Sequence, residues 1–208
     1  MTTFAIAIMK NKILFAIVLF AAISCTEDRV DEFTPSNPET TPEGVEIVPG
    51  IIKVNEFSAT GTDTANHHGD NEEWLEIYNT TDENITLEEG KWFVTDHGWD
   101  NPNRYEIPKH PITDEYLQVP PGEFLFIWCD NNDEIVFRQG NISVHTNFSL
   151  AQDGEDIGIF YQQKDGRFLR IDGYKYEDQR EGISEGRSPD GSNNWKFFEN
   201  PTPGKSNN

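Results

Sequence analysis

Basic residues are scarce in this sequence. Its 208 residues include 16 lysines and arginines against 37 aspartates and glutamates, which gives a formal net charge of −21. Such a surface repels the phosphates of nucleic acids and anionic lipid head groups, so we expect no nucleic-acid partner. The charge instead favours solubility and weak capture of cations.

Cysteine is almost absent as well. The chain has two, Cys25 and Cys129, and if Cys25 is modified no intrachain disulfide can form. Cys129 ends the apolar run Phe124–Cys129, where we expect it to be a small buried side chain. No histidine base lies near it in the sequence, so we predict no nucleophilic role.

Long apolar runs are missing except near the N-terminus. Lys10 and Lys12 precede an apolar stretch at Ile13–Ile23, which is too short to cross a bilayer, since a spanning helix needs about 20 residues. This pattern predicts a cleaved signal peptide over residues 1–24. An uncleaved signal anchor is the alternative, and Met9 is an alternative initiator.

The residues that end this stretch carry a second signal. Ala22-Ile23-Ser24-Cys25 resembles the lipobox of bacterial lipoproteins, although Ala22 stands where that motif prefers leucine. The resemblance implies that Cys25 is lipidated and that the protein contacts the membrane through the lipid anchor alone. The acidic Thr26-Glu27-Asp28 resembles the export signal of Bacteroidetes surface lipoproteins. It implies an outer-membrane location on the cell surface, with the periplasmic face as the alternative.

A proline-rich, acidic stretch follows over residues 25–50. Its prolines are Pro35, Pro38, Pro42 and Pro49. Proline and charge repulsion extend a chain, so we expect a disordered linker that holds a folded domain away from the membrane.

The chain beyond this stretch lacks a sustained helical period. Short apolar runs separated by turn residues predict strands at 51–57, 74–78, 92–94, 104–107, 123–129, 146–150, 157–161, 167–176 and 195–198. Asp165-Gly166 is typical of a hairpin turn. The spacing favours an all-β domain at 51–204, a β-sandwich with about nine strands, followed by a tail at 205–208. We expect Trp74, Trp92 and Trp195 to fill its core.

The order of the motifs resembles the lamin-tail domain, an immunoglobulin-like β-sandwich. The likeness rests on Ile52–Phe57, Glu73–Asn79, Ile85–Leu87, Gly90–Asp96, Pro121–Phe124, Phe148–Glu155, Gly186–Gly191, Trp195 and Pro201–Gly204. It implies a non-catalytic binding or tethering role. The chain departs from the family in longer loops at 60–72, 97–103 and 130–145, and we expect its particular function there.

One hydrolase-like pattern occurs at Gly182–Gly186, which reads G-x-S-x-G. The hydrolase arrangement needs a strand, a sharp turn and a helix, with the histidine following the serine in the chain. All five histidines precede Ser184, and Pro189 follows where a helix would begin. We therefore interpret the match as coincidence.

Metal sites can be sought among the loop histidines and acids. His67 and His68 with Asp70, and His97 with its flanking acids, suggest a transition metal, but adjacent histidines on an extended chain point to opposite faces. We therefore interpret them as solvated. Oxygen-rich loops favour calcium instead, with solvated acidic loops as the alternative. The candidate calcium ligands are Asp63, Asp70, Asp96, Asp100, Asp130 and Asp133. We expect no other cofactor.

A further binding candidate is the loop that carries Trp99. With His97 and Asn101 beside it, this aromatic side chain is suited to stack on a ligand, or alternatively to fold back onto the domain.

Three hypotheses for function follow. The first is a non-catalytic, surface-anchored binding or adhesion module for a cell-surface glycan or protein. The second is a structural accessory that docks a secreted or surface enzyme. The third is an unrecognised hydrolase, which no reaction-specific residue pattern supports.

Overall fold

The computed structural model describes residues 38–98 and 104–207. Within these ranges the chain has 13 strands and no helix. The all-β class is therefore confirmed, whereas the expected number of about nine strands is too low. The predicted signal peptide and Cys25 lie outside the described residues. Among those described, there is no helix of the length and hydropathy that a bilayer span requires.

Seven strands form the larger sheet. They are β1 (Ile52–Ser58), β2 (Trp74–Asn79), β7 (Phe124–Trp128), β8 (Glu134–Arg138), β9 (Asn141–His145), β12 (Ser184–Arg187) and β13 (Trp195–Phe198). Their order across the sheet is β13-β12-β1-β2-β7-β9-β8. Strand β9 runs parallel to β7, and the other neighbours are antiparallel.

The remaining strands form two smaller sheets. They are β3 (Ile85–Leu87), β4 (Trp92–Thr95), β5 (Tyr105–Glu106), β6 (Leu117–Val119), β10 (Asp156–Gln162) and β11 (Phe168–Lys175). One sheet has the order β11-β10-β4-β5, and β3 pairs with β6. The hairpin predicted at Asp165-Gly166 is confirmed, since it joins β10 to β11 and Gly166 has a φ of 85°, a value that glycine adopts without steric cost.

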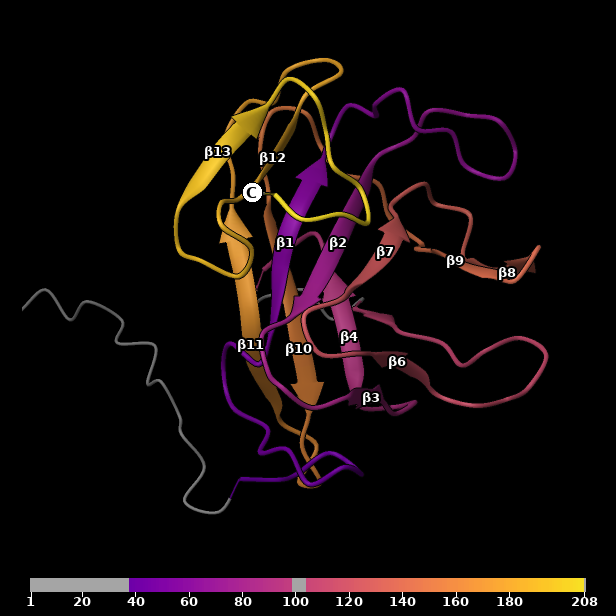
Figure 1. The fold of residues 1–208 in the computed structure, drawn as a ribbon, viewed down its shortest axis with the longest axis vertical. Coiled ribbons are helices and arrows are strands. Elements are labelled where there is room, and N and C mark those ends of the chain that lie inside the picture. The colour runs from indigo at the N-terminus through magenta and orange to yellow at the C-terminus, as the bar shows by residue number, and fades with distance from the viewer. Residues whose placement is uncertain (1–37, 99–103, 208) are drawn as a thin grey trace, which may run out of the picture. The chain divides into compact units, whose positions relative to one another are not determined.

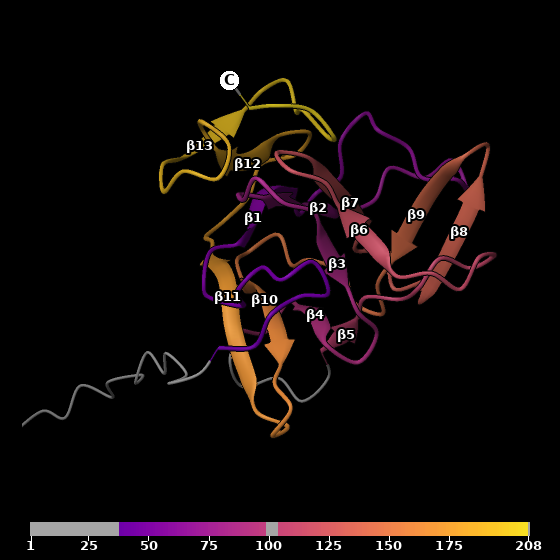
Figure 2. The ribbon, with the colours of Figure 1, turned by 60° about the horizontal axis from the view of Figure 1, so that its bottom comes forward.

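The core lies between the larger sheet and the four-stranded sheet, which form two layers in Figure 2. Alternate side chains of each strand point inward, as Leu75 and Ile77 do from β2 and Ile159 from β10, and all three are fully buried. Each such burial contributes roughly 1.5–3 kcal/mol. The fold is thus β-sandwich-like, held by the inward-facing half of each strand.

The tryptophans do not all fill this core. Trp92 does. Trp74 is buried on the opposite face of its strand from Leu75, where it contacts Phe126 and its indole N–H donates to the Thr62 hydroxyl at 3.2 Å. The long loop between β1 and β2 therefore covers the outer face of the larger sheet. Trp195 is only partly buried. The expectation that all three tryptophans fill the core is wrong, because outer-face loops also bury aromatic rings.

The ordered domain begins before Ile51. Ile47 is buried in the core, and the Gly50 N–H donates to the Ile171 carbonyl at 2.7 Å. The Glu39 carboxylate accepts from the Tyr161 hydroxyl at 3.1 Å. The apolar side chains around Ile47 thus attach the second half of the expected linker to the sandwich, because proline and acid content does not prevent local burial.

The chain end is fixed in a similar way. Asn207 is buried, and its side-chain amide donates to the Arg187 carbonyl at 3.0 Å. Its backbone N–H donates to the Asp190 carboxylate at 3.0 Å. Residues 205–207 therefore belong to the folded body, although the sequence suggested a tail.

Five of the strands are not among those expected, namely β3, β6, β8, β9 and β12 (Figure 1). The strand predicted at 146–150 lies earlier, at β9. The Thr146 hydroxyl donates to the Phe148 carbonyl at 2.8 Å, and such a local bond turns the backbone away from the ladder. Strand β12 was not predicted because Ser184–Arg187 include no apolar side chain, yet all four residues are buried.

Candidate functional site

Two of the three long loops meet beside the end of the larger sheet. Asn66, in the loop between β1 and β2, is buried and closes a turn, since its side-chain oxygen accepts from the N–H groups of His68 and Asp70 at 2.9 and 3.1 Å. Its amide donates to the Asp130 carboxylate at 3.3 Å. Asp130 follows β7, so the turn is attached to the segment that leads into β8 and β9, the outermost pair of the sheet (Figure 2).

This turn brings three histidines together. His67 Nδ1 lies 3.2 Å from His145 Nε2, and the His67 and His68 rings have centroids 3.7 Å apart. The Glu134 carboxylate lies 2.9 Å from His68 Nε2 and 3.4 Å from His67 Nε2. His145 and Glu134 are partners across the β8–β9 ladder. The group of four side chains, called here the histidine cluster, thus joins one loop to one hairpin.

The expectation that His67 and His68 point to opposite faces is therefore wrong, although His68 is exposed as expected and His67 is partly buried. It assumed an extended chain, whereas the Asn66 turn places both rings on one side. Asn66 followed by Gly69 is itself a turn signal, and it is the one sequence feature that pointed to this geometry. His145 and Glu134 had no such signal, because strand pairing brings them to the turn.

His145 is the most strongly positioned member of the cluster. Its Nδ1 lies 2.6 Å from the Asp130 carboxylate, and the two side chains are 0% and 1% exposed. The same carboxylate accepts from the Asn132 amide at 2.9 Å. A carboxylate at this distance holds the Nδ1 proton, so Nε2 is left as the atom that faces His67 and the Ser143 hydroxyl.

Electrostatics favour a neutral His67. Burial lowers the pKa of His67, and the neighbouring His68 and His145 rings lower it further, while Glu134 and Asp130 oppose the change. Neutral imidazole is the form that accepts a hydrogen bond or binds a metal ion.

A second group of possible metal ligands comprises Asp96, His97 and Glu155. His97 Nδ1 lies 2.8 Å from the Asp96 carboxylate, and this hydrogen bond raises the pKa of His97. Burial raises the pKa of Glu155, whose carboxylate accepts from the Ala151 N–H at 3.0 Å. This group contains one imidazole, that of the exposed His97. It therefore offers a metal ion fewer nitrogen ligands than the histidine cluster does.

The aspartates proposed as calcium ligands are distributed among different surroundings. Asp63, Asp70 and Asp133 are exposed, while Asp96 belongs to the group just described and Asp130 supports His145. The five described aspartates do not form one set of ligands. Asp100 lies outside the described residues, and so do Trp99 and Asn101 of the proposed ligand loop. His97, the third residue of that loop, is exposed.

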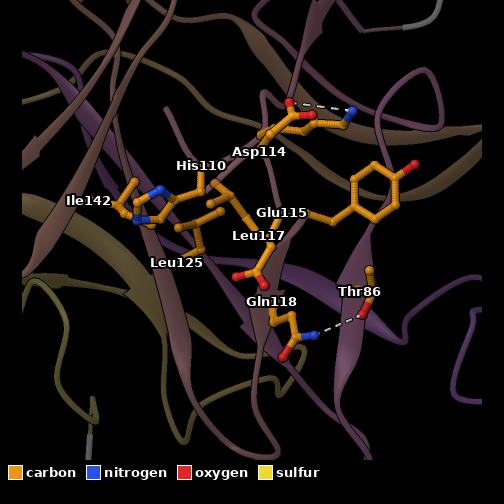
Figure 3. Close-up of a pocket in the computed structure, with 10 residues that line it drawn as sticks. Thr86, His110, Asp114, Glu115, Leu117, Gln118, Leu125 and Ile142 are labelled. Carbon is orange, nitrogen blue, oxygen red and sulfur yellow. Dashed lines mark hydrogen bonds and ion pairs between the residues drawn. The ribbon is translucent and has the colours of Figure 1, made fainter. Parts of the chain in front are cut away.

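An open groove of about 690 Å³ lies near the other face of the β8–β9 hairpin (Figure 3). Ile142 and His145 lie three positions apart on β9, so their side chains point to opposite faces of the hairpin. In Figure 3, His110 and Ile142 lie on one side of the groove and Thr86 and Gln118 on the other. Tyr116 also lines it and is 41% exposed.

The serine of the hydrolase-like pattern has a structural role. Ser184 is buried in β12, and its hydroxyl donates to the Glu56 carboxylate at 2.5 Å. The strand continues through Arg187 without the turn and helix that expose a hydrolase serine. Cys129, predicted to be buried, is fully buried, and burial raises the pKa of its thiol.

Comparison with known proteins adds no relative. No protein-family model matches the chain, and a search of curated proteins finds no match. The likeness to the lamin-tail domain therefore rests on the sequence motifs and is taken up below as a proposal.

Proposed function

We propose that this chain is a non-catalytic binding module of the lamin-tail type, anchored to the outer membrane at the cell surface. We propose further that its groove binds a cell-surface glycan. The observation that carries the binding role is an open groove that combines an exposed aromatic ring with hydrogen-bonding side chains. Rings of this kind stack on ligands, and nearby polar groups fix their orientation.

The strand order supports the immunoglobulin-like part of this proposal. In that fold, strands A, B and E share one sheet and strands C, F and G the other. Here β1, β2 and β7 are neighbours in one sheet, and β4, β10 and β11 are neighbours in the other. Counted in chain order, these six strands match the order of A, B, E and of C, F, G, which supports the proposed topology.

The groove residues suit a polar ligand better than an apolar one. Lys109 Nζ lies 3.0 Å from the Glu89 carboxylate and 5.2 Å from the centre of the Tyr116 ring. The Gln118 amide donates to the Thr86 hydroxyl at 3.3 Å. Charged and amide groups thus flank an aromatic ring, an arrangement that matches the hydroxyl edges and C–H faces of a sugar.

Replacing Tyr116 with alanine tests this role. We expect Tyr116→Ala to weaken binding by about ten- to a hundredfold, the effect of removing an aromatic anchor worth about 1.4–2.8 kcal/mol. Binding is measured on a glycan array and then by calorimetry with a glycan that the wild-type protein retains.

The matched control is Phe197→Ala. Phe197 is also 41% exposed but lies on β13, at the opposite end of the larger sheet from β8. We expect this variant to bind as the wild type does. Equal losses of glycan affinity in both variants would exclude the groove as the binding site. So would a Tyr116→Ala variant that binds as tightly as the wild type. Co-purification with a surface enzyme and no glycan binding would favour the accessory role instead.

Lipid anchoring is tested separately. We expect Cys25→Ser to abolish incorporation of a labelled fatty acid and to move the protein from the membrane fraction to the soluble fraction, because the proposed anchor is the attached lipid. Cys129→Ala is the control, since Cys129 is buried, and it should keep the label. Continued labelling of Cys25→Ser would contradict the proposal, and protease treatment of intact cells distinguishes the surface from the periplasmic face.

A further inference from the structure

We propose that the histidine cluster is a binding site for a divalent transition-metal ion of the zinc class. Its ligands are His67, Glu134 and His145, with His68 as the fourth ligand once its ring moves toward the other three, and Asp130 is a positioning residue behind His145. The site goes beyond the proposed glycan binding, which uses other residues.

The donor atoms select this class of metal. Three imidazole nitrogens and one carboxylate oxygen are a ligand set that suits zinc, whereas calcium takes six to eight oxygen ligands. Among the described residues, His67, Glu134 and His145 each offer a ligand atom, and these atoms lie within 4.8 Å of one another. His68 lies outside that group, although its Nε2 is 2.9 Å from the same Glu134 carboxylate, so its ring must move closer to His145 to complete the set.

One pair of ligand atoms already has the spacing of a filled site. Tetrahedral zinc with bonds of about 2.0–2.1 Å keeps its ligand atoms about 3.3 Å apart. His67 Nδ1 and His145 Nε2 are 3.2 Å apart. A metal ion between the two nitrogens replaces this contact and the one that the Ser143 hydroxyl makes with His145 Nε2 at 2.8 Å.

The surroundings of His145 provide an independent argument. Metal-bound histidines commonly donate their other ring N–H to a carboxylate, which fixes the tautomer and the ring orientation. His145 makes this contact with Asp130 at 2.6 Å, and both side chains are buried. The Asp130 carboxylate is held in turn by the amides of Asn66 and Asn132 at 3.3 and 2.9 Å. A chain of contacts thus aims His145 Nε2 at His67.

The placement indicates a structural ion. Four protein ligands close a tetrahedral site, whereas catalytic zinc keeps a position for water. His67 and His68 come from the loop that covers Trp74, while Glu134 and His145 come from the outermost hairpin of the sheet. An ion bound here therefore fastens that loop to the sheet, in the way that a disulfide fastens two segments.

The test is titration of the full-length protein, first treated with a chelator, with Zn²⁺ and with Co²⁺. We expect one ion per chain, a visible Co²⁺ spectrum of the tetrahedral type that Zn²⁺ abolishes, and a rise in melting temperature with Zn²⁺ that the chelator reverses. Calcium should cause neither change. Binding should weaken as the pH falls, because protons compete for the imidazoles.

Variants assign the ligands. We expect His67→Gln, together with His68→Ala, to lower the Zn²⁺ affinity by more than a hundredfold, and Asp130→Asn to lower it by about 10- to 100-fold, the effect typical of an outer-shell carboxylate. His67 and His68 lie in a surface turn, so circular dichroism should show a folded variant. His97→Ala is the control, since His97 belongs to the other group of possible ligands, and it should bind Zn²⁺ as the wild type does.

Three outcomes would overturn the proposal. The first is no binding of Zn²⁺ or Co²⁺ at micromolar concentrations. The second is unchanged affinity in the folded His67, His68 double variant. The third is loss of binding in His97→Ala alone, which would move the site to Asp96, His97 and Glu155.

Discussion

Glu76→Gln is expected to flatten the pH dependence of stability between pH 4.5 and 8. Glu76 is fully buried on β2. Burial is the main cause that raises the pKa of its carboxyl group from 4.5 to about 8; the nearby Glu56 and Asp190 carboxylates act in the same direction, and hydrogen bonds from Gly204 and Asn55 act in the opposite direction. The group is therefore protonated in the folded protein at neutral pH.

The sign of the effect follows from proton uptake. Between pH 4.5 and 8 the folded state holds the Glu76 proton and the unfolded chain has released it, so folding is favoured by acid. The contribution is complete below pH 4.5 and is lost as the pH rises through about 8. The slope of this pH dependence is at most about 1.4 kcal/mol per pH unit. Glutamine resembles the protonated acid and carries no titrating proton.

Urea unfolding at several pH values measures this prediction. The wild type should lose stability relative to Glu76→Gln by a few kcal/mol from pH 5 to pH 8. The control is Glu123→Gln, because Glu123 is exposed, and its curve should run parallel to that of the wild type. A Glu76→Gln curve parallel to the wild type would show that Glu76 does not carry the effect.

Arg187→Ala is expected to destabilise the protein by about 3–5 kcal/mol, the usual cost of leaving one charge of a buried pair without its partner. Arg187 is 4% exposed, and its guanidinium donates to the Asp172 carboxylate at 2.9 Å and to the Val54 carbonyl at 2.7 Å. It also lies over the Trp195 ring, 4.5 Å from its centre. One side chain thus joins β12 to β1, β11 and β13.

The free energy of unfolding from urea curves checks this value. Arg187→Lys should recover only part of the loss, because an ammonium group cannot donate to the Asp172 carboxylate and the Val54 carbonyl in the fixed geometry of a guanidinium. Arg167→Ala is the matched control. Arg167 pairs with Asp165 at 2.6 Å, but both side chains are about half exposed, and exposed pairs contribute little. A small loss of stability in Arg187→Ala would contradict the prediction and would indicate that water solvates the Asp172 carboxylate in the variant.

Local sequence patterns predicted much of the sandwich. Strands with alternating apolar residues, such as β2 and β10, were found close to their true bounds, because one face of each must be buried. The Asp165-Gly166 turn was found because few residues adopt its backbone conformation. Strand β12 was not predicted because its buried side chains are polar. Their hydrogen-bond partners lie far away in the sequence, as Glu56 does for Ser184.

The candidate sites were predicted less well. The sequence pointed to loops 60–72 and 130–145 as places where function resides, and both contribute to the histidine cluster. It did not pair His67 with His145, because 78 residues separate them in the sequence and no local pattern indicates that the two side chains meet. Nor did it predict the groove, whose walls come from four separate strands and the loop that contains His110.

The sequence by itself determined the all-β class, the hairpin turn and the half of each strand that faces inward, because these depend on side-chain alternation and on local backbone preference. Only the tertiary structure decided which faces of the outer strands are covered, which polar groups are buried in pairs and which histidines meet. Those features depend on strand order and loop packing, which bring together residues that no local pattern relates.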